Sequence, residues 1–214
     1  MDTVKILIYF HASLGGLALL AGFIAAMTTK GSKTHKKFGS VFHHSMVISV
    51  LISIFIALIP SHFNPFLLGI GVFSLYSVIS GRRCLKVLKP NYNLIPDKVL
   101  AYGLLVNSVL MIGLPLILTR EINIILAVFG ILGLLAGIRD LIAFQNFEQL
   151  KRDRIKHHIN KISGGYIAAI TAFLVVNELL PGYWAWFTPT LIGSLYATYY
   201  NIKRNRETAN FINS

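Results

Sequence analysis

The stretch NIILAVFGILGLLAGIRDLIAFQ, residues 123–145, carries charge only at Arg139 and Asp140, both close to its carboxyl end. A bilayer core about 30 Å thick is crossed by a helix of roughly 20 consecutive apolar residues. The stretch is therefore predicted to be a membrane-spanning helix. Arg139 can reach the membrane surface through its long side chain.

The rest of the chain has the same character. Of its 214 residues, 55% are hydrophobic and only 13% are charged, and the mean hydropathy is +0.65. These values lie well outside the usual range of soluble domains. Little sequence remains between the apolar runs, so we predict one membrane domain over residues 1–214, an all-α seven-helix bundle. The predicted spans are residues 5–27, 41–60, 65–84, 98–118, 123–145, 158–180 and 184–203.

The basic residues gather on alternate loops of this pattern. They follow the first, third, fifth and seventh spans, whereas the other side carries only Lys5 and Arg120. Under the positive-inside rule, this places the amino terminus outside and the carboxyl terminus in the cytoplasm. The net charge of +12 is then explained by attraction to anionic lipid headgroups at the cytoplasmic rim, and a nucleic-acid partner is not expected.

Small residues at four-residue spacing predict where the helices pack, because they let two backbones approach closely in a bilayer. Spans one to three and five to seven would also run in the same directions, as in a loose 3+1+3 repeat. The predicted interior stripes are Ala18, Gly22 and Ala26; Ser45, Ser49 and Ser53; Gly133 and Gly137; and Gly164, Ala168 and Ala172.

Five of the seven histidines fall at the cytoplasmic ends of the second and sixth spans. Neutral imidazole binds haem iron and transition metals, and paired histidines on facing helices hold haem in membrane cytochromes. We expect His157 to point into the bundle, and His158 toward a neighbouring helix or the headgroups. The predicted ligands of haem b or a transition metal are His43, His44, His157 and His158, with His11 as an outer ligand and His35 and Asp140 as metal ligands.

Two other interpretations of these groups remain open. Histidines at a membrane interface also bond headgroups, water and helix ends, or they handle protons near neutral pH. Asp140 is expected to pair with Lys161 or to orient His157. The alternative functions are a small-solute or proton-coupled transporter, with a path lined by His11, Asn107, Asp140 and His157, and a non-catalytic subunit that assembles with a membrane partner or with its own copies.

Enzymatic motifs are missing from the sequence. Cys84 is the only cysteine, which excludes an intrachain disulfide and CxxC sites. The chain also lacks GxSxG, HExxH and a phosphate-binding loop. A catalytic role is therefore not predicted.

Several segments resemble an uncharacterised family of bacterial predicted membrane proteins, the domain of unknown function 2306. The resemblance rests on HASLGGLALLAGF (11–23), HKKFG (35–39), HHINKISGGYIAAITAFLVVN (157–177) and FTPTLIGSLYATYY (187–200). It implies a multi-pass protein of the bacterial inner membrane, and it matches the family's histidines to His11, to His35 and to His157 or His158. A weaker similarity to b561-like membrane cytochromes implies haem, although those proteins place paired histidines within their helices.

Overall fold

The computed structural model describes residues 3–212, with side chains described as far as Arg206. Residues 1, 2, 213 and 214, which the predicted domain also included, lie outside the described part. Within it, seven α-helices and two short 3-10 helices form the whole fold, and no β-strand is present. The helices are α1 (Thr3–Met27), α2 (Lys33–Leu58), α3 (Pro65–Arg83), α4 (Ile95–Thr119), α5 (Ile124–Ala143), α6 (Phe147–Val176) and α7 (Trp184–Ile212), with η1 (Pro60–His62) and η2 (Cys84–Lys86).

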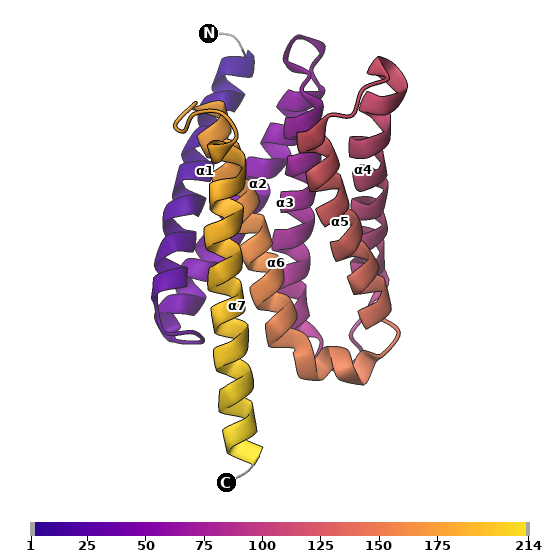
Figure 1. Cartoon of the computed structure of the whole chain (residues 1–214). Coiled ribbons are helices and arrows are strands. Elements are labelled where there is room, and N and C mark those ends of the chain that lie inside the picture. The colour runs from indigo at the N-terminus through magenta and orange to yellow at the C-terminus, as the bar shows by residue number, and fades with distance from the viewer. Residues whose placement is uncertain (1–2, 213–214) are drawn as a thin grey trace.

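Six of these helices, α1 to α6, are long and apolar enough to cross a membrane. The helical, multi-pass membrane character that the hydropathy predicts is thereby confirmed. The seventh helix, α7, is long enough but carries more polar residues. Figure 1 shows the helices standing side by side, with the connections gathered at the two ends of the bundle.

Two helices begin well before the predicted spans. α2 begins at Lys33 rather than residue 41, because the Ser32 side chain accepts a hydrogen bond from the backbone nitrogen of His35 at 3.1 Å and caps the helix. α6 begins at Phe147 rather than residue 158, with Asn146 as its capping residue. Hydropathy marks the membrane-crossing part of a helix, whereas capping residues mark its start. The basic segment 151–157, predicted as a loop, is therefore helical.

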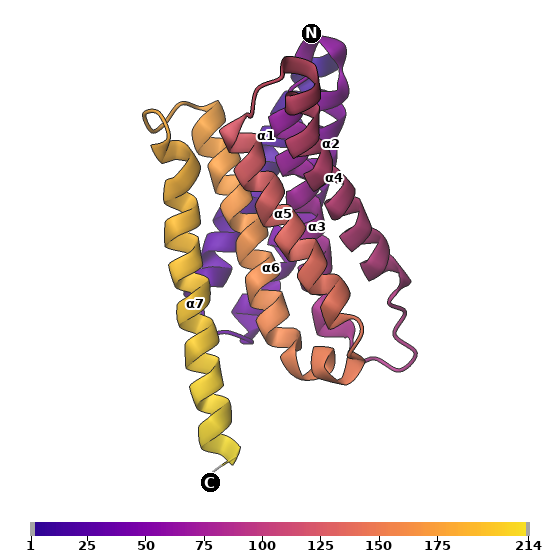
Figure 2. The ribbon, with the colours of Figure 1, turned by 45° about the vertical axis from the view of Figure 1, so that its right-hand side comes forward.

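Helices α1, α2, α3 and α6 form a four-helix core. Ala18 and Ala21 of α1 pack with Phe42 and Met46 of α2 and Val78 of α3, and side chains of α6 close the cluster. α4 and α5 pack on each other beside α3, while α7 packs on α6 (Figures 1 and 2). The core thus contains α2 and α6, the two helices that carry five of the seven histidines.

Glycines mark two close crossings in this core. A Cβ atom on Gly22 would lie 2.6 Å from the ring of Tyr166, and one on Gly165 would lie 3.0 Å from Val78. The predicted stripes on α1 and α2 are therefore largely interior, with Ser45 and Ser49 buried. The packing does not repeat as 3+1+3, because α1 contacts α2 extensively whereas α5 has few contacts with α6.

Candidate functional site

A buried ion pair joins α5 and α6 near one end of the bundle. The Lys161 Nζ lies 2.5 Å from Asp140 Oδ2, and the Tyr76 hydroxyl of α3 donates to the same oxygen at 2.6 Å. The side chains of Asp140 and Lys161 are only 5% and 10% exposed. Ionisable groups inside a membrane protein are costly to bury, so this Tyr76–Asp140–Lys161 cluster is a candidate functional site. The predicted partnership of Asp140 with Lys161 is confirmed.

Two further groups lie within electrostatic range of this cluster. The charges of Lys161 and Asp140 both act on His157. The same two charges act on Cys84, which is buried at the start of η2. The cluster is therefore a small polar region enclosed by α3, α5 and α6, next to the segment that leads into α6.

A second ion pair, which sequence reasoning missed, fixes the connection between α3 and α4. Arg83 Nε donates to Asp97 Oδ1 at 2.9 Å and Nη2 donates to Oδ2 at 2.7 Å, a two-bond pairing. The Tyr92 hydroxyl donates to Asp97 Oδ2 at 2.8 Å. Burial, and then the hydrogen bond to Asp97, raise the pKa of Tyr92 above its usual value. The available signal was Asp97 itself, an acidic residue in the first turn of a helix.

His35 of α2 and His158 of α6 share one bonding pattern. His35 Nδ1 lies 2.9 Å from the Ala25 carbonyl oxygen of α1, and His158 Nδ1 lies 2.8 Å from the Gly81 carbonyl oxygen of α3. A carbonyl only accepts, so each Nδ1 carries the proton and each Nε2 keeps its lone pair. The charge of His35 also acts on His158. Each of the two imidazoles is thus oriented by a carbonyl of a neighbouring core helix.

His11 repeats this pattern nearer the other end of the bundle. Its Nδ1 lies 2.9 Å from the Ser49 carbonyl oxygen, and the Ser49 hydroxyl donates back to the His11 carbonyl at 2.9 Å. These bonds tie α1 to α2. No second histidine of the described chain is bonded to this pair, so His11 stands apart from the others.

The remaining predicted ligands are held differently. His44 is exposed, and its Nδ1 donates to the Ser40 carbonyl of its own helix at 2.8 Å. His43 packs edge-on against the His44 ring, and its Nδ1 is buried without a hydrogen-bond partner. It is His158, and not His157, that bonds a backbone carbonyl of another core helix. His158 thus turns toward a neighbouring helix, as predicted, and Ala168 of the predicted interior face is buried.

The described residues contain no group of three or more His, Cys, Asp or Glu side chains arranged to hold a metal ion. The seven predicted ligand residues are divided instead among the His35–His158 pair, the Asp140 cluster, the His43–His44 pair and the separate His11. The structure therefore offers two-residue sites and no compact metal cage within residues 3–212.

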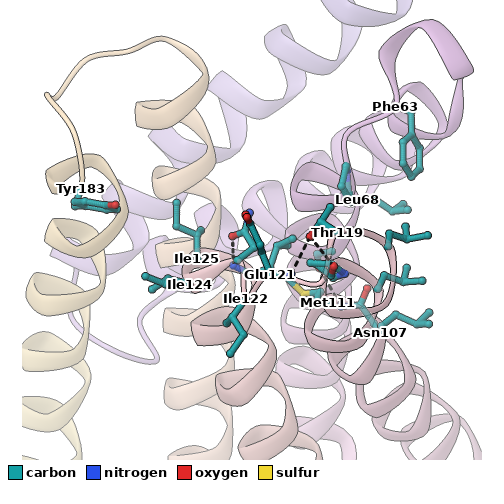
Figure 3. A pocket seen from close by; sticks show the side chains of 18 residues that line it. Phe63, Leu68, Asn107, Met111, Thr119, Glu121, Ile122, Ile124, Ile125 and Tyr183 are labelled. Atoms are coloured by element: carbon teal, nitrogen blue, oxygen red, sulfur yellow. Dashed lines mark hydrogen bonds between the residues drawn. The ribbon is translucent and has the colours of Figure 1, made fainter.

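The other end of the bundle has an apolar cleft of about 640 Å³ beside the α4–α5 connection (Figure 3). Asn107, which was predicted to line a transport path, reaches this cleft and donates to the Gly69 carbonyl at 3.1 Å. None of the histidines lines it. Most of the lining is apolar, including Phe63, Leu68, Met111 and Ile124, and Thr119 and Glu121 are among its polar members.

No protein-family model, curated protein or solved structure matches this chain.

Proposed function

We propose that this chain is a small multi-pass protein of the bacterial inner membrane that binds haem b through His35 and His158, for electron transfer or cofactor handling. One observation carries the proposal: both imidazoles are anchored through Nδ1 to carbonyls of neighbouring core helices, which leaves Nε2 free. Ligand histidines are characteristically oriented by such a bond from their other ring nitrogen.

Haem fits this pair better than a bare metal ion does. A structural or catalytic metal site takes three or four protein ligands, whereas haem supplies four nitrogens of its own and needs at most two axial side chains. His35 and His158 come from α2 and α6, on different sides of the four-helix core. When bound, haem would supply one-electron redox chemistry, and His35 and His158 would hold its iron.

The proposed topology has seven crossings, with the amino terminus outside. It is supported by the basic residues, which collect at the end of the bundle that holds the α1–α2, α3–α4 and α5–α6 connections. It is supported further by α7, which runs beside α6 in both views (Figures 1 and 2). This places the His35–His158 pair at the cytoplasmic side, close to anionic headgroups. The resemblance to the uncharacterised family and to b561-like cytochromes is part of the same proposal.

The test is an absorption spectrum of the purified protein, oxidised and then reduced with dithionite, from cells supplied with a haem precursor. We expect a Soret band that shifts on reduction and is lost in His35→Ala and in His158→Ala. His44→Ala and His62→Ala are matched controls and should keep the band, because His44 bonds its own helix and His62 lies in an exposed turn. A colourless protein of full helicity, free of metal by elemental analysis, would contradict the proposal.

Proton-coupled transport is a second candidate, favoured by the buried Tyr76–Asp140–Lys161 cluster. Carboxylates and their partners inside transporters commonly relay protons. In vesicles with an imposed pH gradient, a transporter should show solute-dependent proton flux that Asp140→Asn abolishes. Flux that is unchanged by this substitution would exclude the cluster from the pathway.

A further inference from the structure

Arg82, in the last turn of α3, reaches across to α2 without meeting an acid. Its Nη1 lies 3.4 Å from His44 Nε2, and its Nη2 lies 3.5 Å from the Ser40 hydroxyl. Both distances are long for hydrogen bonds. The next residue, Arg83, forms an ion pair with Asp97. Two adjacent arginines in the same helix turn therefore differ in whether they have a carboxylate partner.

The surroundings of Arg82 are positively charged. The charges of Arg82 and Lys86 both act on His43, whose neighbour in the chain is His44. Among the described residues, the ion pairs that form involve other basic side chains, and none joins a carboxylate to Arg82. This end of the α2–α3 contact therefore holds cationic and hydrogen-bonding groups without a carboxylate partner among the described ion pairs, an arrangement that attracts an anion.

An apolar stripe continues from this cationic site along the lipid-facing side of α2. His44, Ile48, Leu51 and Phe55 follow each other at spacings of four, three and four residues, which places them on one helix face. Ile48, Leu51 and Phe55 are 49%, 50% and 60% exposed. The rise along these residues is roughly 16 Å, about the depth of one lipid leaflet.

We propose that Arg82 and Ser40 bind the phosphate of an anionic phospholipid, with the His44 ring orienting Arg82, and that the acyl chains of this lipid lie along Ile48, Leu51 and Phe55. The phosphate supplies the missing negative charge, and the apolar stripe selects a lipid over a small anion. Cationic sites between helices on the cytoplasmic side recognise such headgroups. The site is independent of haem, and its occupancy is measured without any optical signal.

The test is mass spectrometry of the intact protein released from detergent, after incubation with phosphatidylglycerol, with phosphatidylcholine, or with inorganic phosphate alone. We expect retention of phosphatidylglycerol that falls about fivefold or more in Arg82→Gln. Arg139→Gln is the matched control, because it removes the same charge from an exposed site at the same end of the bundle, and it should change retention little.

Other outcomes would overturn the proposal. If Arg82→Gln and Arg139→Gln reduce the retention of phosphatidylglycerol equally, the lipid is attracted by the basic residues of this end in general and not by a site at Arg82. Binding of inorganic phosphate as strong as that of the lipid, with the same dependence on Arg82, would mean a free-phosphate site. If Arg82→Gln does not fold, as judged by its helicity, the Ser40→Ala variant replaces it, and undiminished lipid retention in that variant would exclude the site.

Discussion

At the scale of single residues, Asp140 is the position at which one substitution should lower the stability of the folded protein most. Asp140→Asn would leave the Lys161 ammonium buried without its counter-ion. Breaking a buried pair from one side typically costs about 3–5 kcal/mol. We expect a large fall in the unfolding temperature in detergent, as measured by circular dichroism.

The matched control for this prediction is the double variant Asp140→Asn with Lys161→Met. It removes both charges, so much of the lost stability should return, because two uncharged partners leave no buried ion. If the single Asp140→Asn variant unfolds at the wild-type temperature, the ion pair is hydrated in the folded protein. Removing one partner then leaves no buried charge without solvation.

Tyr92 gives a pH dependence of defined sign. Its pKa is raised by burial and by the hydrogen bond to Asp97, so the folded phenol stays protonated above the value of 10.0 expected for the unfolded chain. The stability that it contributes is complete below that unfolded value and is lost as pH rises through the folded pKa. Tyr92→Phe should therefore be less stable than wild type at pH 8, by about 1.5 kcal/mol.

The difference in unfolding temperature between wild type and Tyr92→Phe should then narrow as pH rises above about 10, because Tyr92 ionises in the unfolded wild-type chain and the variant has no hydroxyl at this position. Unfolding temperatures measured in parallel across this range check the prediction. A gap that stays constant or widens above that pH would show that the Tyr92 hydroxyl is solvated in the folded protein.

At the scale of helices, the α4–α5 contact depends on glycine. A Cβ atom on Gly130 would lie 2.6 Å from Ile112 Cγ1 and 3.0 Å from the Ser108 carbonyl oxygen. Gly130→Ala should therefore push the two helices apart and cost about 1–3 kcal/mol of stability. Thermal unfolding in detergent measures this effect.

Gly103, on the outer side of α4, is the matched control. A Cβ atom there meets nothing within 4 Å. Gly103→Ala should leave stability unchanged or raise it by about 0.5–1 kcal/mol, because alanine favours helix. Equal effects of the two substitutions would mean that backbone flexibility, and not helix packing, explains the Gly130 result.

The helices also show what could be predicted from the sequence. Of the seven predicted spans, six correspond to α1 to α6, the helices that are long and apolar enough to cross a membrane, because hydropathy reflects the lipid environment. The starts of α2 and α6 could not be predicted in this way, because Ser32 and Asn146 set them by local capping. The partner of His158 could not be predicted either, because the sequence does not show which carbonyl of the neighbouring α3 lies beside it.

At the scale of the whole molecule, the buried polar groups and the apolar cleft lie at opposite ends of the bundle. One end collects the Asp140 and Asp97 ion pairs, the His35–His158 pair and Arg82, whereas the other holds the apolar cleft near Tyr183. α7 is joined to this polar end through Tyr196, whose hydroxyl donates to the Ala26 carbonyl at 2.8 Å and accepts from Lys30 at 2.6 Å. A peripheral helix is thereby tied to the core where the charged groups lie.

The topology itself can be tested with cysteine labelling, because the native Cys84 is buried and gives little background. Ser61, Lys37 and Lys203 are exposed and lie in η1, near the start of α2 and in the carboxyl-terminal half of α7. We expect a membrane-impermeant maleimide to label Ser61→Cys in intact spheroplasts, and to label Lys37→Cys and Lys203→Cys only after permeabilisation. Labelling of Lys203→Cys alongside Ser61→Cys would mean that α7 does not cross, and labelling of Lys37→Cys from outside would invert the proposed orientation and move the His35–His158 pair to the external face.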